Sequence, residues 1–385
     1  MGYSMPVNPE AMGYESWAGV ERVLCVRLDT LGDVLMTTPA IRALKHSSPR
    51  RRITLMTSAS GAATAELIPE LDDVLVYDAP WMKAGSSHVT ARPDVDLTMV
   101  EQLRQIAFDA AVIFTVYSQS ALPAAMLCYL AGIPRRLAHC RENPYDLLTH
   151  WVRETEPETC LRHEVRRQLD LVATVGAYTC DERLSMAIPN EVNSSVDDLL
   201  AGVIEEGRPW VVIHAGATAA SRRYPPESFA IVGRRLVQDL GYEVIFTGTE
   251  PERPLIEEIQ AEMGEPSHSL VGALDLPVFA AVLARASLLI SNNTGAVHVA
   301  AAVGTPVVDL YALTNPQHTP WHVPHRVLFR DVPCKYCYKS VCPEGHHDCL
   351  RLVEPVQVLN AVAELLERPD VSSRTRGVSL VHTRD

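Results

Sequence analysis

Residues 23–46 read VLCVRLDTLGDVLMTTPAIRALKH, and this stretch decides the fold class. The apolar, partly β-branched run at 23–28 predicts a buried strand. Gly32 and Asp33 then lead into a helical pattern that continues to His46. A buried strand that passes directly into a helix is typical of a parallel α/β sheet.

The same alternation continues through the rest of the chain. In the first half it predicts strands at 53–58, 74–78 and 109–115 and helices at 95–107 and 118–131, before a loop-rich stretch that ends near Met186. In the second half it predicts strands at 210–214, 243–247, 288–291 and 307–311 and helices at 226–240, 252–263, 276–286 and 295–303. The sequence therefore predicts an α/β protein with two Rossmann-like, doubly wound domains.

The domain boundaries follow from changes in pattern. We expect an N-terminal domain over 20–188, a linker over 189–208 and a C-terminal domain with a cysteine cluster over 209–352. A C-terminal helix should occupy 353–367, and the polar tail 368–385 should be disordered. Because ligands of doubly wound sheets bind beyond the carboxyl ends of the strands, we expect the two domains to face a central cleft lined by strand-to-helix loops.

Charge and composition exclude several classes of protein. The formal net charge is −13, which argues against a nucleic-acid partner and against adhesion to anionic lipid, since both need basic surface. No long uncharged apolar stretch predicts a transmembrane segment, and residues 1–17 lack the pattern of a secretory signal. We therefore expect a cytoplasmic protein.

The loop that follows the first predicted strand offers a candidate base. Gly32 lets the backbone approach a ligand closely, and Asp33 lies in the first turn of the next helix, where the helix dipole favours a carboxylate. A carboxylate held in this way could accept a proton from a hydroxyl group. The alternative is that Asp33 only caps the helix.

The second loop reads HAGATAASRRYPPESF, residues 214–229, and contains two adjacent arginines. Arg222 and Arg223 could form a fork that holds a diphosphate through charge-assisted hydrogen bonds. The alternative is that one of them is a solvated surface residue. His214 and Gly216 lie where the preceding strand ends, although a histidine at such a position is more often structural than catalytic.

The third loop reads SNNTGAVHVAAAVGTPVV, residues 291–308. Asn293, Thr294 and Gly295 pass from a strand into a helix of small residues, and a helix N-terminus of this kind suits an anion such as phosphate. His298 follows Thr294 by four positions and shares its helix face. Ordinary N-capping by Thr294 or Asn293 is the alternative.

Other common chemistries lack their motifs. No G-x-G-x-x-G follows the first strand, and no G-x-x-x-x-G-K-[ST], H-E-x-x-H or G-x-S-x-G occurs. The dinucleotide dehydrogenase, P-loop, metalloprotease and α/β-hydrolase interpretations therefore lose their main support.

The order and content of these loops resemble glycosyltransferase family 9 over residues 20–366. RLDTLGDVLMTTPAIRAL at 27–44 and the pattern S-N-x-T-G-x-x-H-x-A-A-A-x-G-T-P at 291–306 carry the resemblance. It implies a GT-B fold, with an acceptor-side N-terminal domain and a C-terminal domain that binds a nucleotide sugar. It also implies an inverting glycosyltransferase without an organic cofactor, which moves heptose from ADP-heptose to a hydroxyl acceptor, as the lipopolysaccharide heptosyltransferases of that family do.

The resemblance also implies roles for individual residues. Asp33 would be the general base, and Arg222 would bind the donor phosphates ahead of the pair Tyr224-Pro225. The diphosphate and donor sugar would be held by Thr294, Gly295 and His298. The remaining residues expected at the donor site are Gly32, His214, Gly216, Arg223 and Asn293.

One position departs from the family pattern. Heptosyltransferases of the family commonly carry an aspartate where this chain has Asn293, and the amide keeps the hydrogen-bonding shape but loses the charge. Another nucleotide sugar as donor therefore stays open, as does a sugar-nucleotide-binding protein with weakened catalysis. The acceptor could be a glycan, a metabolite or a protein.

Four of the nine cysteines form a cluster. CKYCYKSVCPEGHHDC spaces Cys334, Cys337, Cys342 and Cys349 as C-x2-C-x4-C-x6-C, which is typical of a structural zinc or iron site. Either neighbouring histidine, at 346 or 347, could replace one thiol. Some protein-modifying heptosyltransferases that resemble the family carry a four-cysteine iron site near the C-terminus, which supports a metal here. Clustered free thiols or a disulfide pair are the alternatives.

Overall fold

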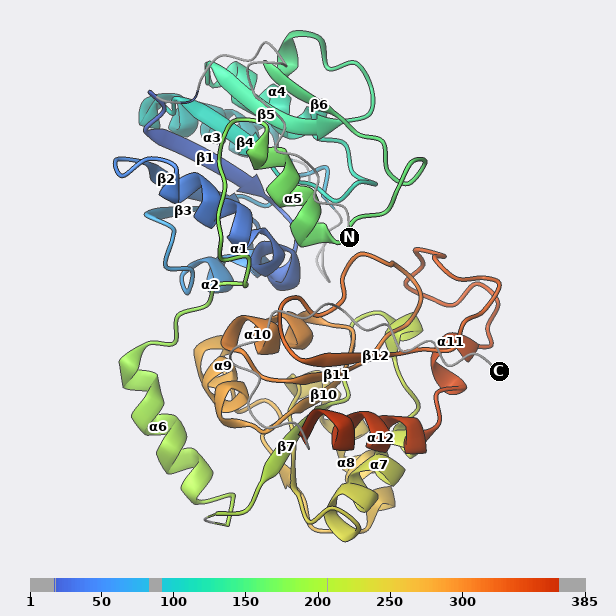
Figure 1. Ribbon diagram of the computed structural model, residues 1–385. Helices are drawn as coiled ribbons and strands as arrows, with labels where there is room; N and C mark the ends of the chain where they lie inside the picture. Colours follow the sequence, from blue (N-terminus) through green and yellow to red (C-terminus); the bar gives the residue numbers. More distant parts are fainter. Residues whose placement is uncertain (1–16, 18, 83–91, 206, 367–385) are drawn as a thin grey trace. The chain divides into compact units, whose positions relative to one another are not determined.

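The structure is a computed structural model that describes residues 17, 19–82, 92–205 and 207–366. The chain divides into two compact units, Met1–Ala187 and Ile188–Asp385. Within the described residues, each unit is built on one six-stranded sheet in which every strand pair is parallel (Figure 1). The two doubly wound domains expected from the sequence are therefore present.

Unit 1 has the strand order β3-β2-β1-β4-β5-β6. Helices α1, α2 and α5 pack together on one face of this sheet, and α3 and α4 pack on the other (Figure 1). Because both faces are covered, the central strands β1 and β4 are apolar almost throughout. The strands are β1 (Arg22–Arg27), β2 (Arg52–Thr57), β3 (Asp73–Val76), β4 (Ala110–Ile113), β5 (Arg135–Cys140) and β6 (His150–Arg153). The helices are α1 (Leu31–His46), α2 (Ala59–Ala65), α3 (Pro93–Ile106), α4 (Leu122–Leu130) and α5 (Glu164–Ala173).

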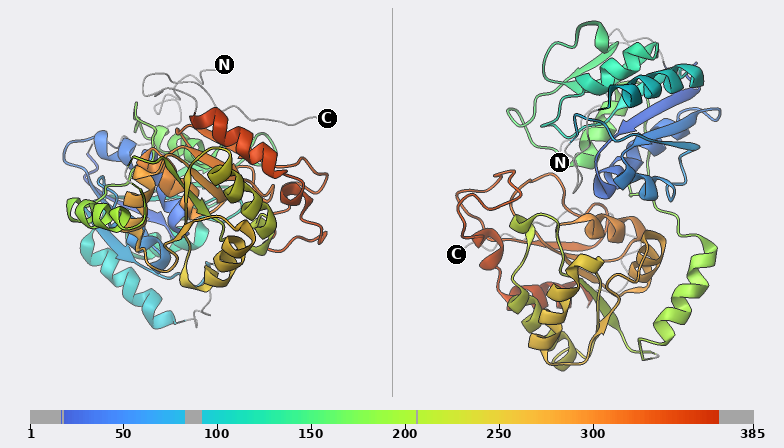
Figure 2. Two further views of the ribbon diagram at one scale, coloured as in Figure 1. Left: turned by 90° about the horizontal axis from the view of Figure 1, so that it is seen from below. Right: turned by 180° about the vertical axis from the view of Figure 1, so that it is seen from behind.

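Unit 2 has the strand order β12-β11-β10-β7-β8-β9. Helices α7, α8 and α12 gather on one face of the sheet, and α6, α9 and α10 gather on the other (Figures 1 and 2). The strands are β7 (Trp210–His214), β8 (Glu243–Phe246), β9 (His268–Ser269), β10 (Leu289–Asn292), β11 (Val307–Leu310) and β12 (His325–Leu328). The helices are α6 (Asn190–Ala201), α7 (Pro226–Gln238), α8 (Arg253–Met263), α9 (Leu276–Arg285), α10 (Gly295–Val303), α11 (Asp348–Arg351) and α12 (Pro355–Leu366).

Both sheets follow one topology. Counted from the first strand of its own unit, each sheet has the order 3-2-1-4-5-6, so the direction of winding reverses between β1 and β4 in unit 1 and between β7 and β10 in unit 2. The connections after the two strands at such a point leave on opposite faces of the sheet, which opens a crevice at their carboxyl ends. These two reversal points are therefore where ligand sites are expected.

The segments at the unit boundaries have their own structure. Residues 189–208, expected as a linker, contain α6, and this helix packs on α9 of unit 2, where Arg285 Nε lies 2.7 Å from Asp197 Oδ1. Within the region expected as a C-terminal helix, 353–367, α12 packs against α7 and β12 of the same unit. The predicted disordered tail, 368–385, lies outside the described residues.

The sequence prediction was wrong for the end of unit 1. The stretch expected to be rich in loops holds two strands and a helix, β5, β6 and α5, and these complete the sheet and one of its covering layers. Their sequences, RRLAHC, HWVR and EVRRQLDLVA, mix charged with apolar residues, so they lack the apolar runs that identify the central strands.

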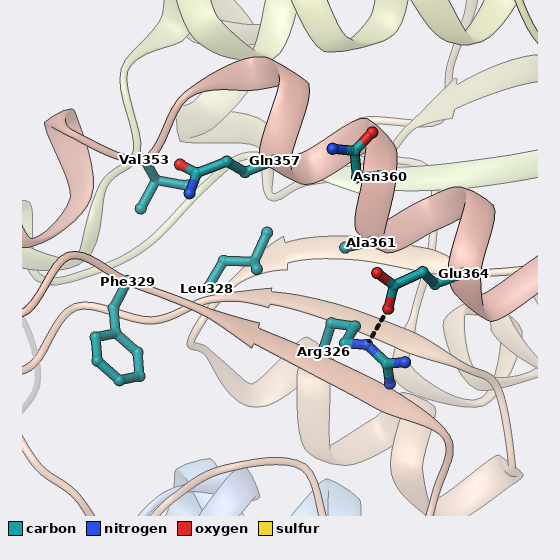
Figure 3. A pocket seen from close by; sticks show the side chains of 8 residues that line it. All are labelled: Arg326, Leu328, Phe329, Val353, Gln357, Asn360, Ala361 and Glu364. Atoms are coloured by element: carbon teal, nitrogen blue, oxygen red, sulfur yellow. Dashed lines mark hydrogen bonds and ion pairs between the residues drawn. The ribbon is translucent and has the colours of Figure 1, made fainter. Parts of the chain in front are cut away.

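A cavity of about 140 Å³ lies between β12 and α12 in unit 2 (Figure 3). The ion pair between Arg326 Nε and Glu364 Oε2, 2.8 Å apart, lies at one end, and Leu328, Phe329 and Val353 contribute apolar surface. None of the site residues expected from the sequence lines this cavity. Within the described residues, no helix combines the length and the apolar character needed to span a membrane.

Candidate functional site

A buried arginine organises the turn between β1 and α1. Arg27 is the last residue of β1 and is fully buried. Its Nε lies 2.9 Å from Asp29 Oδ2, its Nη2 donates to Asp33 Oδ1 at 3.0 Å, and its Nη1 donates to Glu164 Oε1 of α5 at 2.7 Å. One guanidinium thus holds three carboxylates that come from the turn, from α1 and from α5.

The charges in this cluster do not balance. Burial by itself would lower the pKa of Arg27, but the three carboxylates raise it by more than burial lowers it. The guanidinium therefore stays protonated. Burial raises the pKa of Asp29 to about 6, because the attraction of Arg27 is offset by repulsion from Asp33 and Glu164. A single cation does not neutralise three acids, so the cluster keeps excess negative charge at neutral pH, and Asp29 takes up a proton only as the pH falls toward about 6.

Asp33 caps a helix, and its position is also compatible with a role as a base, so both interpretations offered by the sequence apply to it. Its Oδ2 accepts hydrogen bonds from the backbone N and the Oγ1 of Thr30, at 3.3 and 3.0 Å, which completes a capping box at the start of α1. Its other oxygen is bound to Arg27, and its side chain is 17% exposed. The carboxylate is therefore held on both sides and still reaches solvent, next to the buried Gly32.

In unit 2, His214 ends β7 in a neutral state. Its Nδ1 lies 3.1 Å from Thr247 Oγ1, and burial lowers its pKa, although Glu252 acts in the opposite direction. Glu252 also packs against the backbone of Gly216, where an added Cβ would lie 1.9 Å from Glu252 Oε1. A larger residue at that position would displace the carboxylate of Glu252, so this side chain packs closely against the loop.

The two adjacent arginines have different surroundings. Arg222 ends the short 3-10 helix η3 (Ala220–Arg222) and is half-buried, and its guanidinium has no hydrogen-bond acceptor among the described residues. Arg223 is exposed and donates from Nε to the carbonyl oxygen of Ala217 at 2.8 Å. Of the pair, Arg222 is the one whose guanidinium keeps all of its donors for a ligand, within the described residues.

Asn292, which the sequence analysis did not single out, joins the second and third loops. Its Oδ1 accepts from the backbone N of Tyr224 at 2.9 Å, and its Nδ2 donates to the carbonyl oxygen of Ala215 at 2.7 Å. These two hydrogen bonds fix the distance between the second and third loops at the reversal point between β7 and β10.

Neither expected residue caps α10 with its side chain. Thr294 is the N-cap residue, but its hydroxyl makes no capping bond, and its buried Oγ1 has no partner within the described part of the chain. The Nδ2 of Asn293 instead donates to Asp309 Oδ2 at 3.1 Å and to the carbonyl oxygen of His318 at 2.9 Å. The first turn of α10 is thus left without a side-chain cap, with the buried His298 one turn further on.

A buried carboxyl lies beside Asn293. Asp309, in β11, is fully buried, and its Oδ1 has no partner among the described residues. Burial raises the pKa of Asp309 to about 8, while the hydrogen bond from Asn293 and the charge of Arg222 act against that rise. At neutral pH most Asp309 side chains are therefore protonated and uncharged.

All nine cysteines are free in the structure, so the alternative of a disulfide pair is not realised. Cys334 Sγ lies 3.8 Å from His346 Nε2. Burial raises the pKa of Cys349, and Cys342, Cys334 and Cys337 lie near enough to raise it further. Even so, within the described residues no three side chains of His, Cys, Asp or Glu converge closely enough to hold a metal ion.

The cysteine loop is bonded to the other loops of unit 2. Ser221, next to Arg222, donates from its backbone N to the carbonyl oxygen of Ser340 at 3.0 Å and from Oγ to that of Lys339 at 2.7 Å. The backbone N of Tyr336 donates to the carbonyl oxygen of Leu313, just after β11, at 2.6 Å. The loop that carries the cysteines therefore supports η3 directly.

Comparison with known protein families settles the class of this arrangement. Residues 97–347 match the model of glycosyltransferase family 9 (heptosyltransferase). The chain belongs to this family. The glycosyltransferase class and the family predicted from the sequence are thereby confirmed.

Individual relatives extend over almost the whole glycosyltransferase. Lipopolysaccharide heptosyltransferase 2 of Escherichia coli K12 is 24% identical over 357 residues, which cover 90% of this chain and 98% of that protein. The solved structure of the E. coli ADP-heptose lps heptosyltransferase II has a TM-score of 0.69 at 22% identity and covers 90% of this chain and 98% of its own. The predicted GT-B fold class is therefore confirmed.

A third relative is similar in fold only. The iron-containing dodecameric glycosyltransferase TibC from enterotoxigenic E. coli H10407 has a TM-score of 0.53 at 15% identity, and the match covers 91% of this chain and 77% of that one.

Residues of the candidate site that the sequence analysis did not single out include Arg27, Asp29, Asn292, Asp309 and Glu164. Asp309 left a visible signal, because a single carboxylate interrupts the apolar strand VVDL. Asn292 stood next to a residue that was considered. Glu164 left none, because its segment was read as a loop, and burial of an acid does not show in the sequence.

The raised pKa of Asp309 predicts how the stability of the glycosyltransferase depends on pH. An unfolded aspartate has a pKa of about 3.9, below the folded value of about 8. Between these values the folded state keeps a proton that the unfolded state has lost, so this group lowers the free energy of unfolding as pH rises, by at most about 1.4 kcal/mol per pH unit. Asp309→Asn removes the titration and keeps an acceptor for Asn293.

The variant should therefore gain stability relative to the wild type as pH rises from about 4 to about 8, and the gap should level off above that range. Urea unfolding of both proteins across this range measures it. A gap that stays constant with pH would show that Asp309 does not titrate as described.

Proposed function

We propose that this glycosyltransferase moves a heptosyl group from ADP-heptose to a hydroxyl acceptor with inversion at the anomeric carbon. The observation that carries the proposal is the uncapped N-terminus of α10, where the Thr294 hydroxyl is buried without a partner among the described residues. A helix N-terminus with a hydroxyl beside it binds phosphate groups. Relatives named as heptosyltransferases, one of them by its donor ADP-heptose, support this choice of donor.

The surroundings of this N-terminus favour a diphosphate. Asn293 is uncharged, and Asp309 is mostly protonated near neutral pH, so neither repels an anion. Arg222 lies near enough to Asp309 to influence its pKa, and its guanidinium has no acceptor among the described residues. Arg222, Thr294 and Gly295 would hold the phosphates, while His298 and His214 would contact other parts of the donor.

Asp33 has the features of a base in this reaction. Arg27 and Thr30 fix its orientation, and 17% of its side chain is exposed. It would accept the proton of the acceptor hydroxyl as that oxygen attacks the anomeric carbon. Positioning, together with stabilisation of charge on the departing diphosphate by Arg222 and α10, would supply most of the rate enhancement.

Calorimetric titration with ADP, UDP, GDP and ADP-heptose tests the choice of donor without a known acceptor. Binding of ADP and ADP-heptose alone is the expected result. Preference for UDP or GDP would replace heptose by another nucleotide sugar. Absence of binding to all four ligands would contradict a nucleotide-sugar transferase.

Arg222→Ala should weaken the binding of ADP by about 1.5 to 3 kcal/mol, the range for hydrogen bonds to charged groups. Arg235→Ala is the matched control, because it removes an arginine of α7 that is paired with Asp239 at the surface of the same unit. Equal affinity of wild type and Arg222→Ala would remove this residue from the donor site.

Asp33→Ala should abolish transfer and leave ADP-heptose binding close to that of the wild type. Thr30→Ala, which breaks the same capping box at a cost of about 1 kcal/mol, separates loss of the base from loss of the cap. Transfer and donor affinity are measured on both variants. If Thr30→Ala is as inactive as Asp33→Ala, or if donor affinity collapses in Asp33→Ala, the aspartate has a structural role.

We also propose that the four cysteines bind a structural zinc or iron ion. The thiols suit a soft, tetrahedral metal, and Cys334, Cys337 and Cys342 lie near Cys349, although they are not drawn together to ligand distances. Tyr336, Tyr338 and His347 have positive φ angles, an unfavourable conformation for residues other than glycine. Metal ligation would offset this strain, and an iron-containing relative supports the proposal.

Cys334→Ser should lower both the metal content and the melting temperature, because three thiolates hold such an ion less tightly than four. Elemental analysis and thermal unfolding measure the two effects, with Cys160→Ser, an exposed thiol of unit 1, as the control. Wild-type protein that is purified without metal, and melts unchanged after zinc or ferrous iron is added, would contradict the site. The predicted cytoplasmic location stays a prediction.

A further inference from the structure

A cavity of about 390 Å³ opens at the reversal point of the unit 1 sheet. Its wall includes Val26 and Leu28 from the end of β1, and Ile113 and Thr115 from the end of β4. This volume lies in the range of small-molecule sites, and the carboxyl ends of strands at a reversal point are where doubly wound sheets bind ligands. None of the residues assigned to the donor lines it.

The cavity is acidic. Among the described residues that line it, Asp29 is the one ionisable side chain, and there is no lysine, arginine or histidine. Arg27, whose Nε lies 2.9 Å from Asp29 Oδ2, is already shared by Asp29, Asp33 and Glu164. A phosphate or carboxylate placed here would meet negative charge without a free cation, so the cavity disfavours an anionic ligand.

The polar groups of the wall suit hydroxyl groups. Asp29 Oδ1 accepts from Gln119 Nε2 at 2.6 Å, and this carboxyl–amide pair offers both acceptors and donors. Ser118 and Ser120 add two exposed hydroxyls, of which that of Ser120 already donates to Glu142 Oε1 at 2.8 Å, and Thr115 Oγ1 has no partner within the described residues. A ligand with several hydroxyl groups would satisfy these atoms.

The apolar part of the wall suits the C–H face of a sugar ring. Trp81 lines the cavity, and the ring of Tyr77 lies behind it, with centroids 5.8 Å apart at 59°. The hydroxyl of Tyr77 donates to Asp96 Oδ1 at 2.7 Å, and this hydrogen bond holds the Tyr77 ring in place behind Trp81. A rigid aromatic side chain gives a flat apolar surface on which a pyranose can pack at little cost in side-chain entropy.

A second cavity of about 370 Å³ shares the loop Ser118–Ser120 with the first. It contains His139, whose pKa is held well below its ordinary value by burial, so that side chain is neutral. Its arginine, Arg141, is already bound to Glu158 at 2.7 Å. The additional space is thus also without a free cation among the described residues, and it has room for a further sugar unit.

We propose that the cavity lined by Asp29, Trp81 and Gln119 is the acceptor subsite and that it takes an uncharged, hydroxyl-rich carbohydrate. The inference rests on the proposed function, because it supplies the hydroxyl that Asp33 would deprotonate. Asp29 and Asp33 share one guanidinium through Nε and Nη2, so a hydroxyl bound by Asp29 lies beside the base. Asp29, Gln119 and Trp81 are specificity-determining residues in this assignment.

Saturation-transfer difference NMR tests the subsite. It is carried out on the full chain in the presence of enough ADP to occupy the donor site. The probes are methyl glucoside, methyl galactoside and methyl mannoside, with glucose 6-phosphate and mannose 6-phosphate as anionic counterparts and a short neutral serine peptide as a non-sugar hydroxyl. At least one neutral glycoside should bind, and more tightly than either phosphate. Tighter binding of a phosphate, binding of the peptide alone, or binding of none of the probes overturns the proposal.

Variants assign the binding to this cavity. Trp81→Ala and Gln119→Ala should each weaken the glycoside by about tenfold, Trp81→Phe should restore part of the loss, and ADP affinity should not change. Tyr129→Ala, which removes an exposed aromatic ring of α4 outside the cavity, is the control. Unchanged glycoside binding in Trp81→Ala overturns the proposal. Loss of ADP binding by the wild type contradicts the proposed donor instead, so the two failures are distinguishable.

Discussion

The guanidinium of Arg27 is the interaction on which the rest of unit 1 depends. It is fully buried, and its three nitrogens bind carboxylates from the β1–α1 turn, from the first turn of α1 and from α5. Removal of Arg27 would leave three carboxylates without their shared counter-ion, which is strongly destabilising. The same contacts that join the helices to the strand therefore also fix the carboxylate proposed as the base, so folding and catalysis share one set of atoms.

The two units use one topology for different chemistry. In both, polar side chains gather where the winding of the sheet reverses, because the crevice there leaves the ends of two central strands uncovered. In unit 1 that place is acidic around Asp29, whereas in unit 2 the carboxyl of Asp309 is mostly protonated and Arg222 supplies positive charge. An uncharged acceptor and a diphosphate donor are the ligands that these two environments favour.

The sequence predicts the elements that carry strong periodicity. The run at 23–28 and the helix to His46 correspond to β1 and α1 within two residues at either end, and the two motif loops lie at the reversal points, as their positions after central strands require. Strand β5 and the edge strand β6 were missed because both mix polar with apolar residues, so their sequences resemble a loop. Missing α5 meant missing Glu164, whose role depends wholly on its burial against Arg27.

The electrostatic state of the site was also beyond the sequence. Replacement of the family's aspartate by Asn293 reads as a lost charge, yet the structure places Asp309 against that amide. Whether a carboxyl at that place is ionised depends on desolvation and on the distance to Arg222, and both are properties of the folded chain. With Asn293 in place, the site still contains a carboxyl group, that of Asp309, which is mostly protonated at neutral pH.

The cysteine loop connects the proposed metal to the proposed donor site. Its backbone carbonyls at 339 and 340 accept both hydrogen bonds of Ser221, the residue before Arg222, and its Tyr336 is bonded to the segment after β11. A four-thiolate metal site has no open coordination position for chemistry, so its effect on the reaction must pass through such backbone contacts. A metal that orders this loop would stabilise η3 and with it the position of the Arg222 guanidinium. Metal content and donor affinity are then linked through folding, although no ligand of the metal touches the donor.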